Sequence, residues 1–172
     1  LSLYGQTKTI AETLLLERNG TVGYRFATAF GVSGRLRLDL LINDFVNRAL
    51  KQKYIVVYER KFMRTFIHVC DMGRAFIFAL ENFNRMKNNA YNVGSEKMNY
   101  SKEDICELIK QKTEVYVHYA DIGEDADKRN YVVNYDKIKM LGYTTEITVE
   151  DGIDELLRAL QSVNFKDPYS NA

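Results

Sequence analysis

The chain has 172 residues, of which 46% are hydrophobic and 27% charged, as in an ordinary globular domain, and no apolar run reaches the roughly 20 residues of a membrane helix. A net charge of +1, from 24 basic and 23 acidic residues, gives no basic surface for nucleic acid or an anionic membrane. Two isolated cysteines and two histidines argue against a disulfide framework, a metal site or a histidine-based triad, so we expect a cytoplasmic protein without a metal.

The chain begins with a helical pattern that is followed by a strand. Apolar residues recur at helical spacing from residue 4 to residue 18, and Asn19-Gly20 is a typical helix end. The next segment, 21–31, is rich in β-branched and aromatic residues and closes with a glycine, which predicts a strand.

The middle of the chain continues the alternation of helices and strands. Segment 33–53 predicts a loop and then a helix, whereas 54–58 and 64–69 predict two short strands. Segment 71–83 predicts a helix that begins with an acidic cap at Asp71. Because nearly all residues of this helix are apolar, we expect it to be deeply buried.

The last part of the chain repeats the same pattern. Ser101 and Asp104 have the spacing of a capping box at the start of a helix. The elements predicted here are strands at 90–94 and 115–122 and helices at 101–112, 134–143 and 148–163. Alternating strands and helices predict an α/β fold with a parallel sheet.

Tyr4 and Lys8 are four residues apart, so on a helix they share one face. A neighbouring ammonium lowers the pKa of a tyrosine, which allows the phenol to take a proton from a substrate hydroxyl. The spacing alone is a weak signal, because the chain has 12 tyrosines and repeats the pattern at Tyr135 and Lys139. From these residues alone, a catalytic pair and two solvated side chains both remain open.

Five segments, in order, resemble the extended short-chain dehydrogenases, the NAD-dependent epimerase/dehydratase family that acts on nucleotide sugars. YGQTKTIAE is similar to the active-site helix of that family, which reads Tyr-Gly-x-(Ser/Thr)-Lys with a Glu four residues on, here Glu12. The other segments are RFATAFG, MRTFIHVCDMGRA, YNVGS and DKRNYVVNYDKIKMLGY, and the five cover nearly the whole chain. The second Tyr/Lys pair matches none of the family's active-site positions.

The resemblance implies a role for each matching residue. Tyr4 would be the general base or acid in hydride transfer at a sugar carbon, and Lys8 would hold the nicotinamide ribose of NAD or NADP. Phe26 and Ala27 would contact the nicotinamide through backbone groups. The residues implied to bind a nucleotide-diphosphate sugar are Thr28, Arg37, Tyr58, Arg64 and Arg129. Of these, Arg64 and Arg129 would clamp the diphosphate, because guanidinium groups offer bidentate donors.

Two positions depart from the family pattern. Thr28 stands where the family usually has Asn, and Val32 stands where it usually has Pro. The Thr hydroxyl keeps one donor and one acceptor on a single atom, whereas the Asn amide carries them on two separate groups. We therefore expect the sugar or diphosphate contact to differ at that point. Loss of the proline is expected to loosen the following loop.

The resemblance also implies a domain organisation. Residues 1–34 would supply the active-site helix and a strand of a Rossmann-type parallel sheet, and residues 35–172 mainly a smaller α/β substrate-binding domain. Strand 90–94 would return to the Rossmann sheet. The glycine-rich turn that holds the pyrophosphate in this family does not occur in the sequence. We therefore expect the N-terminal cofactor-binding half to be absent and the 172 residues alone to be inactive.

The sequence predicts the C-terminal, substrate-binding part of an NAD(P)-dependent nucleotide-sugar epimerase, dehydratase or reductase. The resemblance also implies a homodimer, and the charge balance and the lack of a long apolar run predict no nucleic-acid or membrane partner. A non-catalytic nucleotide-sugar-binding or regulatory module of the same fold remains the alternative. A third possibility is an enzyme of this fold that acts on a flavonoid or steroid, against which the two diphosphate-binding arginines argue.

Overall fold

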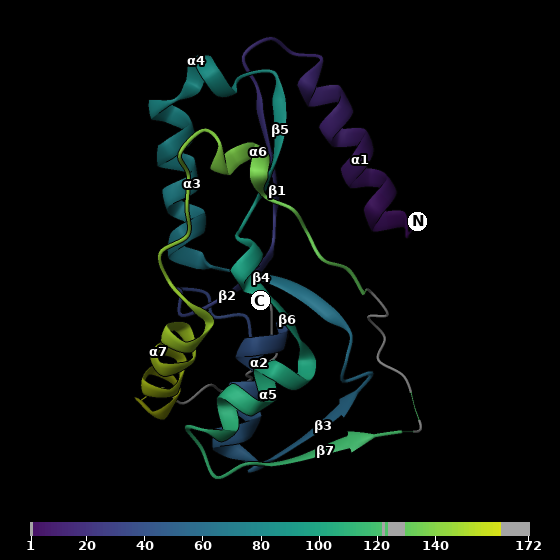
Figure 1. The fold of residues 1–172 in the computed structure, drawn as a ribbon, viewed down its shortest axis with the longest axis vertical. Coiled ribbons are helices and arrows are strands. Elements are labelled where there is room, and N and C mark those ends of the chain that lie inside the picture. Colours follow the sequence, from purple (N-terminus) through teal and green to yellow (C-terminus); the bar gives the residue numbers. More distant parts are fainter. Residues whose placement is uncertain (1, 122, 124–129, 163–172) are drawn as a thin grey trace.

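The computed structural model describes residues 2–121, 123 and 130–162 and shows a mixed α/β fold with parallel strand pairs. Figure 1 shows the arrangement of its elements. In chain order they are α1 (Leu3–Leu16), β1 (Val22–Phe26), β2 (Thr28–Phe30), α2 (Leu41–Lys51), β3 (Tyr54–Tyr58), β4 (Met63–His68), α3 (Val69–Glu81), α4 (Phe83–Met86), β5 (Asn89–Val93), the 3-10 helix η1 (Glu96–Met98), β6 (Asn99–Ser101), α5 (Lys102–Lys110), β7 (Tyr116–Ala120), α6 (Asp136–Lys139) and α7 (Val149–Ser162).

The described strands form three small sheets. β1 pairs in parallel with β5, β2 pairs in parallel with β4, which is antiparallel to β6, and β3 pairs in parallel with β7. The single strand predicted at 21–31 is therefore divided at Ala27, because the chain leaves β5 there and continues beside β4. Ala27 still donates its backbone N–H to the Val93 carbonyl at 3.0 Å, so the division falls directly after the first sheet.

The β1–β5 pair lies between two helices, with α1 on one side and α3 on the other (Figure 1). Side chains along β1 alternate between these helices, as the period of a strand requires. The rings of Tyr24 and Phe26 contact Phe76 of α3 at centroid distances of 5.6 and 5.5 Å, and the Tyr24 hydroxyl donates to the Ala75 carbonyl. Arg25, between the two aromatic residues, contacts α1 instead.

The larger hydrophobic core lies where α2, α5 and α7 pack against β2, β3 and β4. Its most buried side chains, each no more than 1% exposed, include Phe30, Ile42, Val46, Ile55, Ile105 and Leu156. The predicted capping box at the start of α5 is confirmed: Ser101 Oγ accepts the Asp104 N–H, and the Asp104 carboxylate accepts the Ser101 N–H. None of the helices in the described ranges is long and apolar enough to cross a bilayer.

The prediction for α3 was wrong in two respects. The helix begins at Val69 with His68 as its N-cap, whose Nδ1 accepts the Cys70 N–H, so Asp71 lies inside the first turn and is not the cap. The helix is also not deeply buried, because its small residues Ala75 and Ala79 face the core. Its large apolar residues are exposed: Phe76 by 55%, Ile77 by 58% and Leu80 by 78%.

Asp71 instead fixes the segment that precedes α7. Its side chain is fully buried and accepts the backbone N–H groups of Glu146 and Ile147 at 3.1–3.2 Å. Arg74 Nη1 donates to the same carboxylate at 2.6 Å, and Arg74 also pairs with Glu146. The Tyr143 hydroxyl donates to the Asp71 carbonyl at 2.7 Å. One buried carboxylate thus joins α3 to a segment more than seventy residues away in the chain.

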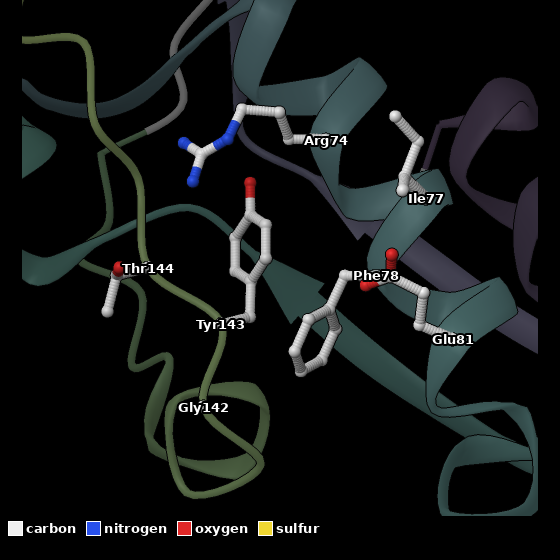
Figure 2. A pocket seen from close by; sticks show the side chains of 7 residues that line it. All are labelled: Arg74, Ile77, Phe78, Glu81, Gly142, Tyr143 and Thr144. Carbon is white, nitrogen blue, oxygen red and sulfur yellow. The ribbon is translucent and has the colours of Figure 1, made fainter.

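A small hollow of about 200 Å³ lies beside this connection, between α3 and the turn that follows α6. Figure 2 shows Tyr143 standing between the Arg74 side chain and the Phe78 ring, whose centroid is 5.6 Å from that of Tyr143. Gly142 closes the turn with φ +105°, a conformation that favours glycine. Burial raises the pKa of the Tyr143 phenol.

Two helical glycines provide a matched test of the packing. A Cβ added at Gly152 of α7 would lie 2.3 Å from Phe30 Cε2 and 3.2 Å from His68 Cδ2, whereas one added at Gly73 of α3 would meet nothing within 4 Å. We expect Gly152→Ala to destabilise the fold by about 2 kcal/mol through overpacking. Gly73→Ala should stabilise it by about 0.5 kcal/mol through helix propensity. Urea unfolding of both variants measures the difference between their free energies of unfolding. Equal urea midpoints for the two variants would contradict the prediction.

Candidate functional site

A groove of about 720 Å³ separates α1 from β1 and the start of β2. It runs along the whole of β1 and reaches the carboxyl end of that strand, and in parallel sheets ligands bind outside the carboxyl ends of the strands. Five of the residues predicted from the sequence line this groove: Tyr4, Lys8, Phe26, Ala27 and Thr28. The structure therefore gathers the predicted catalytic and cofactor-binding residues, and one predicted substrate-binding residue, in one place.

Tyr4 and Lys8 occupy the first two turns of α1. Ser2 caps this helix by accepting the Gly5 N–H at 3.2 Å. The Lys8 Nζ lies 5.5 Å from the centroid of the Tyr4 ring, within the range of a cation–π contact. Tyr4 is 70% exposed, so its phenol can reach a molecule bound in the groove.

The opposite wall of the groove is the chain segment that passes from β1 to β2. Phe26 ends β1, Ala27 is 8% exposed, and Thr28 begins β2 opposite Phe66. Because the Ala27 N–H already donates to Val93, only its carbonyl is left for a ligand among its backbone groups. The Thr28 side chain adds a hydroxyl that can donate and accept.

The other predicted substrate-binding residues do not line this groove. Arg37 forms a bidentate pair with Asp39, Nε to Oδ1 at 2.7 Å and Nη2 to Oδ2 at 2.5 Å, which holds the pKa of the Asp39 carboxyl below its usual value. Tyr58 ends β3 and packs beside Gly123. Arg64 is 2% exposed, and its Nη1 donates to the Met63 carbonyl. Arg129 lies outside the described residues.

The structure adds a charged pair that sequence reasoning did not assign to the site. Arg25 donates to both carboxylate oxygens of Glu12, Nε to Oε2 at 2.7 Å and Nη2 to Oε1 at 2.5 Å, and both residues line the groove. This hydrogen bonding holds the pKa of Glu12 below its usual value, although burial opposes the shift. The sequence does indicate that Glu12 faces the site. It lies four residues after Lys8 and eight after Tyr4, on the same helical face.

A second groove, of about 670 Å³, lies between the end of β5 and the segment that precedes α7. Its lining includes Gly94, where an added Cβ would lie 2.7 Å from the Tyr135 ring. The Tyr135 hydroxyl is hydrogen bonded to Thr65, so this phenol already has a partner. Within the described ranges, no group of three or more His, Cys, Asp or Glu residues could hold a metal ion.

A family model and several solved structures of known proteins are similar to this chain. A family model described as the NAD dependent epimerase/dehydratase family matches residues 1–94. Among similar solved structures is ADP-L-glycero-D-manno-heptose-6-epimerase from Helicobacter pylori, with 20% identity and a TM-score of 0.75 over 94% of this chain and 52% of that one. Another is dTDP-glucose 4,6-dehydratase from Bacillus anthracis in complex with NAD, with 22% identity and a TM-score of 0.77 over 94% and 53%.

A third similar structure is MoeE5 in complex with UDP-glucose and NAD, with 24% identity and a TM-score of 0.77 over 94% of this chain and 56% of that one. At these identities the likeness shows a shared fold. The chain spans about half the length of the structures that it matches.

Proposed function

Because this chain belongs to the NAD-dependent epimerase/dehydratase family, we propose that it carries the catalytic helix and the substrate-binding part of a nucleotide-sugar epimerase, dehydratase or reductase. The observation that supports this most directly is the groove, which brings Tyr4 and Lys8 of α1 opposite Phe26, Ala27 and Thr28. These residues come from α1, from β1, from β2 and from the residue between the two strands, so their convergence is a property of the fold.

The lining of the groove fits the nicotinamide–ribose end of NAD or NADP. Lys8 offers three donors for ribose hydroxyls, and the Ala27 carbonyl is an acceptor for a carboxamide. A volume of about 720 Å³ is within the range of small-molecule sites. When bound, the nicotinamide supplies the acceptor or donor of a hydride.

The roles of the protein side chains follow from their chemistry. Tyr4 exchanges a proton with a sugar hydroxyl as general base and acid, and its 70% exposure leaves the phenol accessible to the sugar. The Lys8 ammonium lies 5.5 Å from the centroid of the Tyr4 ring, so both side chains face a molecule bound in the groove. Thr28 orients the sugar through its hydroxyl. Together these groups hold and move the proton at the Tyr4 oxygen.

The diphosphate contacts proposed for the arginines have weaker structural support. Arg37 would have to exchange Asp39 for a phosphate, and Arg64 would have to leave a site where it is 2% exposed. Arg129 keeps its proposed role from the family resemblance alone. Tyr58 remains proposed as the contact to the nucleotide base.

We also propose a division of the chain into two parts. The parallel pairing of β1 with β5 supports a part made of residues 1–34 and the returning strand near 90–94, with most of residues 35–172 forming the substrate-binding part. The large apolar side chains that α1 leaves exposed, among them Leu3, Ile10 and Leu14, support a homodimer formed through this helix.

Turnover assays of the complete protein test the proposed function. With NAD or NADP present, we expect one of UDP-glucose, UDP-glucuronic acid or dTDP-glucose to be converted to an epimer, a 4-keto sugar or a dehydrated sugar. The products are identified by NMR. Binding of a nucleotide sugar without conversion of any substrate would favour a non-catalytic binding module and overturn the proposal.

A further inference from the structure

Lys102, the first residue of α5, is a buried cation that has no role in the chemistry proposed above. Its side chain is 1% exposed, and lysine is almost never fully buried unless its ammonium is paired. The capping box of Ser101 and Asp104 fixes the first turn of α5, and Ile105 and Ile109 of the same helix lie in the larger core. Contacts within this chain account for the burial of Lys102, so adjoining segments of the complete protein can only add to it.

The Lys102 ammonium contacts the turn that joins β3 to β4. Its Nζ donates to the carbonyl of Tyr58, the last residue of β3, at 3.0 Å. The Glu59 carboxylate lies 3.5 Å from the same nitrogen, and the centroid of the Phe62 ring lies 5.9 Å away, within the range of a cation–π contact. Hydrogen bonds from a charged donor are roughly twice as strong as neutral ones. The contact therefore ties the end of β3 to the start of α5.

The next residue of α5 holds the same turn. The Glu103 N–H donates to the Arg60 carbonyl at 3.0 Å, and the Glu103 carboxylate pairs with Lys61. Within the turn, the Phe62 N–H donates to the Glu59 carbonyl at 2.9 Å. Glu59 has φ +48°, a strained conformation for a residue other than glycine, which persists where the surrounding structure holds it. We call these contacts between the first turn of α5 and residues 59–62 the α5–turn connection.

The strand end that Lys102 holds carries the residue proposed to contact the nucleotide base. Tyr58 pairs with Ala120, the last residue of β7, so the ladder between these two strands ends at Tyr58 (Figure 1). Gly123 packs against the Tyr58 ring, because a Cβ added at Gly123 would lie 2.5 Å from Tyr58 Cε1. The ring is thus confined by Gly123, and the carbonyl of the same residue is held by the Lys102 ammonium.

We infer that Lys102 is a positioning residue for a nucleoside diphosphate, because it holds the end of β3 in the place where the Tyr58 ring can receive the base. The inference rests on the proposed function for the identity of the ligand. The α5–turn connection itself does not depend on that ligand, so the two are tested separately. Since the base takes no part in hydride transfer, loss of the connection should weaken binding and leave the chemical step unchanged.

Hydrogen exchange followed by mass spectrometry tests the connection in the complete protein without any ligand. Lys102→Met keeps an unbranched apolar side chain and removes the charge, so peptides that contain Phe62 or Glu103 should exchange about tenfold faster. Lys110→Met is the matched control, because Lys110 belongs to the same helix and pairs with Glu107 at the surface. It should leave the exchange of these peptides unchanged. Equal exchange in Lys102→Met and the wild type overturns the inference.

The effect on the ligand is tested by calorimetric titration of the complete protein with UDP and with dTDP. Stacking of a base on an aromatic ring contributes roughly tenfold or more to affinity, so Lys102→Met should weaken the tighter of the two nucleotides about tenfold. The KM of the nucleotide sugar should rise by a similar factor, whereas kcat and the affinity for the reduced cofactor should not change. In a Tyr58→Leu background, Lys102→Met should add little, because the ammonium acts through the residue already replaced.

A second variant, Lys102→Met/Glu59→Gln, keeps the test decisive if the single variant does not fold. It does not leave the Glu59 carboxylate facing an apolar side chain, yet it still removes the donor to the Tyr58 carbonyl and should show the same loss of affinity. Unchanged nucleotide affinity, a loss that adds fully to that of Tyr58→Leu, or a lower kcat with an unchanged KM overturns the inference. A wild type that binds neither UDP nor dTDP contradicts the proposed function alone, since hydrogen exchange still decides whether the connection exists.

Discussion

Tyr4→Phe is expected to lower kcat of the complete protein about a thousandfold, because a positioned general acid or base contributes about 10²- to 10⁴-fold. Phe keeps the ring and its contact with the Lys8 ammonium, and the substitution removes only the hydroxyl that would exchange the proton. Since Tyr4 is 70% exposed and no residue of α1 is buried, the fold should be unaffected. Steady-state kinetics with the substrate found in the turnover assays measure the effect.

The chain supplies its own matched control for this experiment. Tyr135 and Lys139 repeat the Tyr-x-x-x-Lys spacing, but Tyr135 is 2% exposed and its hydroxyl is bonded to Thr65, outside the groove that contains Tyr4. Tyr135→Phe should leave kcat nearly unchanged. If Tyr4→Phe were as active as the wild type, or if both variants lost the same activity, Tyr4 would not be the proton-exchanging group.

Asp71→Asn is expected to destabilise the fold by about 3 kcal/mol, because it removes a buried charge that several donors share. The carboxylate accepts two backbone N–H groups, from Glu146 and Ile147, and one guanidinium N–H from Arg74. An asparagine of the same shape turns an NH₂ group toward some of these donors, which leaves them without an acceptor. Denaturant unfolding of the variant and of the wild type measures the change.

Asp154 is the control for the loss of a carboxylate. Its side chain is 43% exposed and pairs with Lys112, so Asp154→Asn should cost less than about 1 kcal/mol. If the two variants unfold at the same denaturant concentration, the burial of Asp71 and its shared donors do not add to the free energy of unfolding as described. The connection between α3 and the segment before α7 would then be supported by packing alone.

Local signals predicted the secondary structure well. The capping box of Ser101 and Asp104 is confirmed because both partners lie within one turn of the chain. The helix predicted at 134–143 is present as the shorter α6, and Gly142 follows it with φ +105°, a conformation that favours glycine. Where the determining contacts are a few residues apart, the sequence contains the information needed to predict them.

Contacts over a long sequence distance account for the errors. The apolar residues of α3 indicated burial, but they do not say which face meets the core, and the small side chains Ala75 and Ala79 occupy that face. Asp71 has the residue type and position of a cap, yet its donors come from residues 146 and 147. No local pattern around Asp71 contains that information.

In the candidate site, too, local features could be predicted from the sequence and contacts between distant segments could not. Tyr4 and Lys8 could be paired from their spacing, and the family resemblance placed Phe26, Ala27 and Thr28 beside them in chain order. Helical spacing places Glu12 on the face of Tyr4 and Lys8, but its bidentate pair with Arg25 depends on how α1 lies against β1 and has no local signal. The roles proposed for Arg64 and Arg129 stay predictions.

The strand registers described above have a consequence for how fast the chain folds. Val22 pairs with Asn89, and Tyr54 pairs with Tyr116, so these parallel pairs close loops of more than sixty residues. Parallel partners cannot be joined by a tight hairpin, and the entropy of loop closure is lost before any of these contacts forms. Helices α2, α5 and α7 can form early from local interactions, but the sheets must wait for distant segments to meet. Folding should therefore be slow, on the order of milliseconds to seconds, and its rate-limiting step should be strand association.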